Sequence, residues 1–194
     1  DILSQIVEFR NNESGMHVRN ISTLTGMLLE KIVQKTDKYY LSWSERFYIT
    51  NGSALHDIGK IGIPKEILNK PGKLTKEEYE IIKEHTVIGE KMLKNLELYQ
   101  DEPLIKTACE IVRWHHERYD GNGYPDGLKG DEIPISAQIV SIADVYDELV
   151  SERVYKEAFS HEKAMEMILN GECGAFNPLL LECLVEIQDR IKNE

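Results

Sequence analysis

The sequence predicts an all-helical protein, and three observations support this fold class. Apolar residues recur three or four positions apart along most of the 194 residues, the spacing that places them on one face of a helix. Sustained alternation of apolar and polar residues, which a half-buried strand needs, is almost absent. Residue types that start or stop helices stand at the ends of the periodic segments. We therefore expect a bundle of about seven helices.

Three helices are expected in the first half of the chain, over residues 16–34, 42–55 and 75–96. Ser42 is suited to cap the second of them, because its side-chain oxygen can accept a hydrogen bond from a free N–H of the first turn. Thr75 and Glu78 open the third with the spacing of a capping box.

Four further helices are expected in the second half, over residues 103–115, 134–149, 160–171 and 177–191. Pro103 suits a first helical turn, where its missing N–H would have no partner in the helix. Ser160 can cap the next-to-last helix, and Gly171 stops it. Asn177 followed by Pro178 is typical of a cap and first turn, and it opens the last helix.

Two segments interrupt the helical pattern. Residues 57–73 hold three glycines and two prolines, and residues 117–134 hold four glycines and two prolines. Loops this rich in special backbone residues often form the walls of binding sites. No linker divides the chain, so we expect residues 13–194 to form one domain. Residues 1–12 are expected to be a tail or linker helix from a preceding domain.

Composition and charge exclude several functions. Lysine and arginine total 23 against 34 aspartates and glutamates, a net charge of −11 that argues against binding of DNA or RNA duplexes. A phosphate-bearing substrate stays compatible with this charge, because bound metal ions can supply positive charge locally. No apolar run is long enough for a membrane span. Three cysteines without CxxC spacing indicate reduced thiols and a cytoplasmic location.

Ionisable residues stand on helix faces that are otherwise apolar. A single inward histidine is usually a core residue with a satisfied hydrogen bond, but an unpaired buried carboxylate costs several kcal/mol. One shared metal centre explains all of these residues together, and imidazole with carboxylate ligands suits Fe, Mn, Co or Zn. The residues concerned are His17, His85, His115, His116, Asp144 and Asp147.

The dipeptide His56-Asp57 is the strongest local signal for this centre. Two adjacent ligands need a helix end, and Gly59 lets the chain leave helical geometry there. The two oxygens of a carboxylate can also bridge two metal ions. Glu13 precedes His17 by four positions, so both side chains can point the same way on a helix.

Three motifs follow one another along the chain. They are HDIGKIGIP at residues 56–64, HHERYDGNGYP at residues 115–125, and the segment 144–160. This combination resembles the HD superfamily of metal-dependent phosphohydrolases, and the second motif is similar to the signature of its HD-GYP subfamily. The resemblance extends over roughly residues 13–191.

The resemblance implies an HD-superfamily helical bundle with a five-helix core, a GYP loop, and two or three divalent ions, with iron or manganese preferred. Asp57 matches the bridging carboxylate, and Lys60 matches a lysine that faces the scissile phosphate. Glu13 matches an acid that accompanies a third ion in some members. The implied metal ligands are Glu13, His17, His56, Asp57, His85, His115, His116 and Asp144.

Substrate-binding positions are implied at Tyr124, Asp147, Arg153 and Lys156. The sequence departs from the family at two places. Where the family has Arg-Pro-Tyr-Arg, this chain has Arg-Val-Tyr-Lys at residues 153–156. The change keeps the positive charge at the last position but loses its planar guanidinium. Phe-Asp-Pro reads Phe-Asn-Pro at residues 176–178, and we expect little structural cost because asparagine caps a helix as well as aspartate does.

The family hydrolyses cyclic di-GMP to linear pGpG, and in some members to GMP, so the resemblance implies a cyclic di-GMP phosphodiesterase. Hydrolysis of another cyclic dinucleotide, such as cyclic GMP-AMP, is also compatible with the motifs, because the sequence does not define the contacts to the bases. A regulatory module with structural metals is a third alternative, but such subfamilies usually lose the His-Asp pair or the GYP loop, and this chain keeps both. A general HD nucleotidase would explain the metal ligands but not the GYP loop. The resemblance further implies fusion to an N-terminal receiver or sensor domain, and homodimerisation is a further expectation.

Overall fold

The computed structural model describes residues 16–152 and 157–192, and these residues form helices and loops without a strand. The predicted all-helical class is confirmed. The expected tail, residues 1–12, lies outside the described residues. The α-helices are α2 (Met16–Lys35), α3 (Trp43–Gly52), α4 (Lys65–Leu68), α5 (Lys76–Lys83), α6 (His85–Lys94), α7 (Pro103–Trp114), α8 (Ile135–Val150), α9 (His161–Leu169) and α10 (Pro178–Ile191). Short 3₁₀ helices cover Ser53–Leu55, Ile58–Gly62 and Gly130–Glu132.

The predicted caps hold the helix ends. Ser42 and Glu45 exchange hydrogen bonds at the start of α3, and Thr75 and Glu78 do the same at the start of α5. In each pair the hydroxyl accepts from the later backbone N–H while the glutamate accepts from the earlier one. Ser160 caps α9 in the same way, with its hydroxyl accepting from the N–H of the third helical residue.

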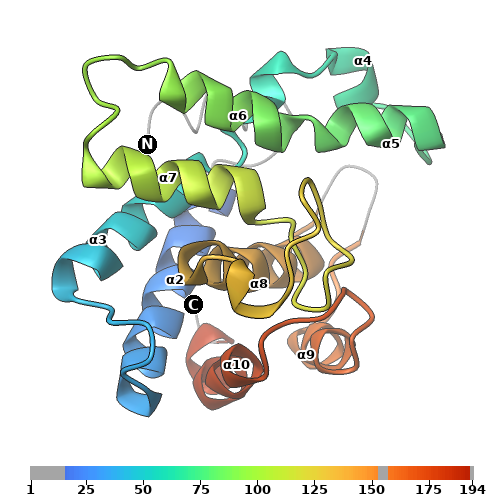
Figure 1. The fold of residues 1–194 in the computed structure, drawn as a ribbon. Helices are drawn as coiled ribbons and strands as arrows, with labels where there is room; N and C mark the ends of the chain where they lie inside the picture. The colour runs from blue at the N-terminus through green and yellow to red at the C-terminus, as the bar shows by residue number, and fades with distance from the viewer. Residues whose placement is uncertain (1–15, 153–156, 193–194) are drawn as a thin grey trace.

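Helix α8 forms the centre of the bundle. It packs against α2, α7 and α9, and α10 in turn packs against α2 (Figure 1). Its side chains are buried along nearly its whole length. Ile139 and Ile142 of α8 meet Ile21 and Leu28 of α2 and Leu184 of α10 in the main core. This core positions the start of α2 and the interior of α8, from which the expected metal ligands His17 and Asp144 come.

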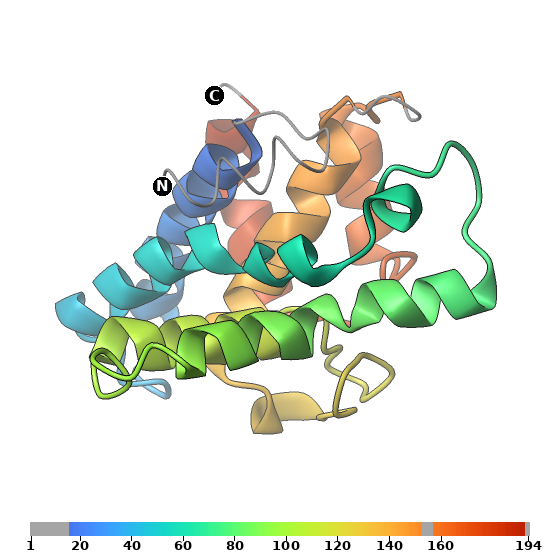
Figure 2. The same ribbon diagram turned by 90° about the horizontal axis from the view of Figure 1, so that it is seen from above.

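A second layer carries the remaining ligands. Helices α6 and α7 run side by side and cross the direction of α8 (Figure 2). Leu93, Ala108 and Val112 form a small buried cluster between them, on which residues of the segment 55–58 also pack. The 3₁₀ helix Ile58–Gly62 lies against α6. The segment that carries His56 and Asp57 is thereby held between the two layers.

The helix expected over residues 75–96 is two helices, with the break at Glu84. The N–H of Glu84 bonds the carbonyl of Ile81, three residues back, which tightens the end of α5. Side chains take over the next two carbonyls: His85 Nδ1 lies 2.7 Å from Ile82 O, and Thr86 Oγ1 donates to Lys83 O at 2.9 Å. The periodicity of apolar residues continues through the break, so the pattern alone did not indicate it.

Asn177 does more than cap the last helix. Its side-chain oxygen accepts from the N–H of Leu179 at 3.0 Å, as expected. Its amide nitrogen donates to Tyr39 Oη at 2.9 Å and to Gln138 Oε1 at 3.0 Å. Aspartate has no donor for these two contacts. The departure from the family's Phe-Asp-Pro therefore has a structural reason in this chain.

None of the helices in residues 16–152 and 157–192 combines the length and the apolar character that crossing a membrane requires.

We expect Gly59→Ala to destabilise the fold by more than about 3 kcal/mol. A Cβ at Gly59 would lie 1.8 Å from the carbonyl oxygen of His85 and 2.6 Å from the nitrogen of Gly89, so backbone would have to move. Urea unfolding measures the change. Gly26→Ala in α2 is the matched control: nothing lies within 4 Å of its Cβ, and helix propensity should stabilise it by about 0.5–1 kcal/mol. Equal stability of the two variants would contradict the close approach.

Candidate metal centre

The structure brings together every predicted metal ligand that it describes. His17 comes from the start of α2, and His85 from the start of α6. His56 and Asp57 follow the 3₁₀ helix Ser53–Leu55. The remaining ligands come from the end of α7 and from α8, and they are His115, His116 and Asp144. Glu13, Arg153 and Lys156 lie outside the described residues.

The ligand atoms form two groups that share one residue. Asp57, His85, His115 and His116 offer atoms that all lie within 4.8 Å of one another. His17, His56 and Asp57 form the second group by the same measure. Asp57 therefore stands where one carboxylate can contact two metal ions.

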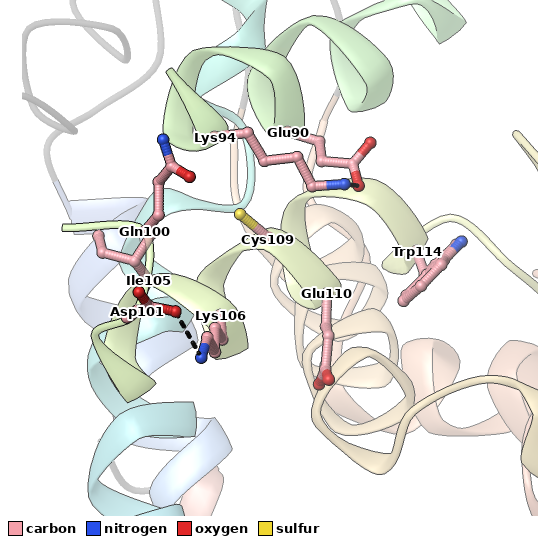
Figure 3. Close-up of a pocket in the computed structure, with 9 residues that line it drawn as sticks. All are labelled: Glu90, Lys94, Gln100, Asp101, Ile105, Lys106, Cys109, Glu110 and Trp114. Atoms are coloured by element: carbon pink, nitrogen blue, oxygen red, sulfur yellow. Dashed lines mark ion pairs between the residues drawn. The ribbon is translucent and has the colours of Figure 1, made fainter. Parts of the chain in front are cut away.

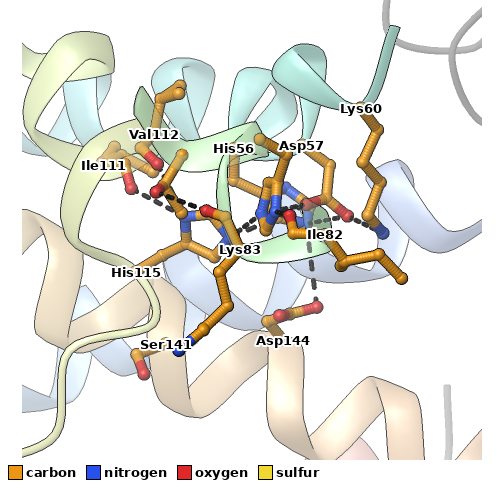
Figure 4. A network of polar contacts seen from close by, with 12 residues as sticks. His56, Asp57, Lys60, Ile82, Lys83, Ile111, Val112, His115, Ser141 and Asp144 are labelled. Atoms are coloured by element: carbon orange, nitrogen blue, oxygen red, sulfur yellow. Dashed lines mark hydrogen bonds and ion pairs between the residues drawn. The ribbon is translucent and has the colours of Figure 1, made fainter. Parts of the chain in front are cut away.

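The two oxygens of Asp57 face different groups. Oδ1 lies 3.3 Å from His85 Nε2 and 3.7 Å from His115 Nε2. Oδ2 lies 3.4 Å from His56 Nε2. Asp144 faces the second group from the opposite helix, with Oδ1 3.5 Å from His17 Nε2 and 3.7 Å from His56 Nε2 (Figure 4). The geometry fits two ions with the Asp57 carboxylate between them.

Four buried atoms of the centre have no hydrogen-bond partner among the described residues. They are His17 Nε2, His56 Nε2, Asp57 Oδ1 and Asp144 Oδ1. Leaving a buried polar atom unpaired costs roughly 1–3 kcal/mol, so a cluster of four needs an explanation. Imidazole nitrogens and carboxylate oxygens that converge on one point are the donor set of a transition-metal site. The residues present thus fit metal ions.

The other ring nitrogens are anchored, which aims Nε2 at the centre. His56 Nδ1 lies 2.8 Å from Ser53 O, and His115 Nδ1 lies 2.9 Å from Ile111 O. His85 is anchored by the carbonyl at the α5–α6 break described above. An Nδ1–H that donates to a carbonyl leaves the lone pair on Nε2, the form that binds a metal.

Carboxylates raise the pKa values of the histidines in the second group. Burial alone lowers the pKa of His56, but Asp57 and Asp144 outweigh burial and raise it to about 10. Burial likewise opposes the charged form of His17, and its contacts with Asp147 and Asp144 raise its pKa overall. A metal ion bound at these rings displaces their protons, so we expect metal binding to weaken as pH falls.

In the first group burial outweighs the carboxylate, and the pKa values of two histidines are lowered instead of raised. Burial lowers the pKa of His115, and burial together with the neighbouring His115 holds the pKa of His116 well below its ordinary value. Burial opposes ionisation of Asp57, but Lys60 and His56 hold its pKa well below the usual range. Neutral rings beside an ionised carboxylate are ready to bind a cation.

Lys60 lies at the edge of the centre, on the same carboxylate that both groups share. Its Nζ is 2.6 Å from Asp57 Oδ2, and the two residues are three apart across the 3₁₀ turn. A protonated ammonium has no lone pair for a metal. Its position therefore suits a group that contacts substrate rather than a ligand (Figure 4).

Tyr124 packs beside the first group. Its ring stacks on His116, with centroids 4.8 Å apart and planes at 18°. Tyr79 of α5 meets it edge-on, with centroids 6.4 Å apart. Burial raises the pKa of the Tyr124 phenol, so it stays protonated and can donate a hydrogen bond.

Asp147 is placed differently from the expectation that it binds substrate. It is 3% exposed, and both of its oxygens are engaged inside the protein. Oδ2 lies 2.6 Å from His17 Nδ1, and Oδ1 accepts from Asn20 Nδ2 at 2.8 Å. These contacts favour a carboxylate that orients the ring of His17 over one that contacts substrate, and substrate binding by Asp147 stays a prediction.

Glu117 is a buried acid beside the site that the sequence analysis did not single out. It is 2% exposed, and its carboxylate accepts the backbone N–H groups of Asp126, Gly127 and Leu128 at 2.7, 3.1 and 3.0 Å. It therefore anchors the loop that carries Tyr124. An acid placed directly after two histidine ligands, at the start of a glycine-rich loop, was the available signal.

A separate pocket of about 470 Å³ lies between α6, α7 and the loop that joins them (Figure 3). Its wall contains none of the predicted ligands. Its lysines are paired with acids of the same wall, Lys94 with Glu90 at 2.7 Å and Lys106 with Asp101 at 3.2 Å. Three acids against two lysines on this wall indicate no particular ligand.

An all-helical bundle that gathers histidines and aspartates around one shared carboxylate defines the HD class of metal-dependent proteins. The sequence model of the HD domain family matches residues 1–175, and the chain belongs to that family. The resemblance to HD-GYP proteins is confirmed by the relatives and by a solved structure.

Two relatives carry names that state a cyclic di-GMP activity. A "Probable cyclic di-GMP phosphodiesterase" of Vibrio cholerae is 42% identical over 97% of this chain and 44% of its own length. A "Cyclic di-GMP phosphodiesterase" of Thermotoga maritima is 39% identical over 98% of this chain and 49% of its own length. The chain thus spans less than half the length of these relatives.

Two further comparisons bear on substrate and on fold. A "3'3'-cGAMP-specific phosphodiesterase 2" of Vibrio cholerae is 39% identical over 96% of this chain and 34% of its own length. The solved structure of an HDG"Y"P protein from Bdellovibrio bacteriovorus superposes with a TM-score of 0.66 at 23% identity, over 89% of this chain and 51% of that one. At that identity the superposition shows the shared fold alone.

Proposed function

We propose that this chain is a metal-dependent phosphodiesterase that hydrolyses cyclic di-GMP to linear pGpG. The observation that carries the proposal is the Asp57 carboxylate, which lies between two ligand groups with Lys60 on its outer oxygen. A pair of metal sites joined by one carboxylate is the arrangement that cleaves phosphodiesters. The names of the cyclic di-GMP phosphodiesterase relatives support the choice of substrate.

The residues of this chain have distinct tasks in that reaction. His85, His115 and His116 would hold one ion, and His17, His56 and Asp144 would hold the other, with Asp57 available to both groups. When bound, the ions lower the pKa of water and polarise the phosphoryl group.

Lys60 donates from its ammonium to a phosphoryl oxygen, where negative charge grows as the bond breaks. Its hydrogen bond to Asp57 holds the ammonium in place. Tyr124 stacks on His116 and belongs to the loop that Glu117 anchors, so its phenol is fixed beside the metal-binding residues. Both residues are proposed to contact substrate, Lys60 at the cut phosphate and Tyr124 beside it.

Iron or manganese is the proposed metal, because nitrogen-rich sites with carboxylates suit both ions. A third ion through Glu13 stays a prediction, as does substrate binding by Arg153 and Lys156. The fused N-terminal receiver or sensor domain and the homodimer also stay predictions. The three cysteines are free thiols, which agrees with the expected cytoplasmic location, itself still a prediction.

A second candidate substrate is 3'3'-cGAMP, favoured by the cGAMP-specific relative at 39% identity. The two cyclic dinucleotides share their phosphates and differ in one base. The metal-binding residues would act on the phosphates that both substrates share, so they would not distinguish the two substrates. Anaerobic incubation of the iron- or manganese-loaded protein with each dinucleotide, followed by nucleotide chromatography, tests the proposal. We expect pGpG from cyclic di-GMP; binding without cleavage under either metal would instead favour a regulatory module.

We expect Asp147→Asn to weaken metal binding about 10–100-fold, because loss of a carboxylate that orients a ligand histidine has effects of this size. The amide keeps the shape but removes the charge beside His17 Nδ1. Competition with a chelator measures the affinity directly. Asp131→Asn, on the carboxylate that pairs with Lys38, is the control and should bind metal like the unmodified protein. Equal metal affinity of the two variants would show that Asp147 plays no part in metal binding.

A further inference from the structure

We propose that Lys83 is a substrate-binding residue that takes the second, uncut phosphate of the cyclic dinucleotide. The inference rests on the proposed function and names a contact that the sequence analysis did not include. It starts from the position of Lys83 at the end of α5, one residue before the helix break that places His85 in the metal centre.

The ammonium of Lys83 is held at a corner between two aromatic rings. It lies 5.4 Å from the centroid of Tyr79 and 5.5 Å from that of Tyr124. The two rings are nearly perpendicular, at 80°. Tyr124 in turn stacks on His116, a predicted ligand. The cation is therefore one ring away from the metal centre and is positioned by contacts with aromatic faces.

The present partner of Lys83 can be exchanged for a phosphate. Its Nζ lies 2.7 Å from Glu80 Oε1, and the Glu80 side chain is 68% exposed. An ion pair this exposed is weak because water screens it, so a phosphate can replace it at little cost. Lys83 itself is only one-quarter exposed, so a phosphate bound there is partly shielded from water.

Two lysines then serve two phosphates. In Figure 4 the side chain of Lys60 ends to the right of Asp57, and that of Lys83 ends at the lower left, below His115. A cyclic dinucleotide carries two phosphodiesters, of which only one is cut at a time. When the phosphate to be cut lies at the metals and Lys60, the other phosphate needs a separate cation at the edge of the metal centre. Tyr79, which is 48% exposed, offers a ring on which the adjoining base can stack.

This contact does not depend on which base the substrate carries. Cyclic di-GMP and 3'3'-cGAMP have the same two phosphates, so Lys83 would bind either. It does distinguish them from a diester with one phosphate. Bis(p-nitrophenyl) phosphate is such a diester, and it reports on the metal centre and Lys60 without the second contact.

The test compares steady-state constants of Lys83→Met with those of the unmodified metal-loaded protein. Methionine keeps the apolar stem against the tyrosines and removes the charge. We expect KM for the cyclic dinucleotide to rise about tenfold to a hundredfold, the effect of losing one charge-assisted hydrogen bond. We expect kcat to change less than about threefold, because the uncut phosphate is bound alike before and during cleavage. The fall in kcat/KM on bis(p-nitrophenyl) phosphate should be at least about tenfold smaller than the fall on the cyclic dinucleotide.

Two further variants make the test specific. Lys83→Arg keeps the charge and should recover most of the lost affinity. Lys91→Met removes an exposed lysine from α6 and should leave KM as it is. A KM for Lys83→Met within about twofold of the unmodified protein would overturn the inference, as would equal losses on the two kinds of diester. If the unmodified protein neither bound nor cut either cyclic dinucleotide, the proposed function would fail first, and the inference with it.

Discussion

Asp57→Asn should lose metal and activity together. The substitution keeps the size of the side chain but leaves a neutral amide where two ligand groups share a carboxylate. We expect the metal content to fall from about two ions per chain to less than one, and turnover to fall by at least about 10³-fold. Metal analysis by mass spectrometry and chromatography of the nucleotide products measure the two quantities on the same sample.

The apo fold should tolerate this change. Oδ1 of Asp57 has no hydrogen-bond partner in the described structure, and the oxygen that pairs with Lys60 is Oδ2, whose hydrogen bond the asparagine oxygen can still accept. Asp37→Asn, in the exposed turn after α2, is the control and should keep its metal content. Full metal content in Asp57→Asn would mean that the ions, where present, are held without a shared carboxylate.

Lys60→Ala should lose activity and keep metal. Removing one group that stabilises charge in a transition state typically lowers the rate about 10²–10³-fold. The metal content should stay nearly unchanged, because an ammonium donates no lone pair to a metal. Turnover and metal content measured together separate this variant from Asp57→Asn, in which both fall.

Metal content must be measured besides turnover because Lys60 is hydrogen-bonded to Asp57, a predicted metal ligand. If metal content fell in proportion to activity, Lys60 would act by holding the carboxylate rather than by contacting substrate. If Lys60→Ala kept full activity, Lys60 would have a structural role only. Lys65→Ala, in the short helix α4, is the matched control and should behave like the unmodified protein.

Helix ends were predictable wherever the signal was local. The last helix was expected over residues 177–191, and α10 covers Pro178–Ile191 with Asn177 as its cap. A cap acts on a backbone N–H two or three residues away, so the sequence contains all of its parts. The break at Glu84 was missed because the side chains of His85 and Thr86 replace helix hydrogen bonds there without disturbing the apolar periodicity.

The roles of individual acids were harder to predict than their positions. Asp144 and Asp147 are three residues apart on α8, so both were expected to point inward, and both do. Their tasks differ because of a partner far away in sequence: His17 presents Nε2 toward Asp144 and Nδ1 toward Asp147. Glu117 was missed for a related reason, since its buried carboxylate serves backbone N–H groups of a loop nine to eleven residues later.

The sequence by itself determined the helical class, most helix boundaries, and the residues that face inward on each helix. These follow from a periodicity of 3.6 residues and from caps, both of which act over a few positions. Only the tertiary structure decided that Asp57 lies between two ligand groups, that Asp147 serves His17, and that Lys83 stands beside Tyr124. Those distances depend on how α2, α6, α7 and α8 pack, and packing is set by shape complementarity between segments far apart in the chain.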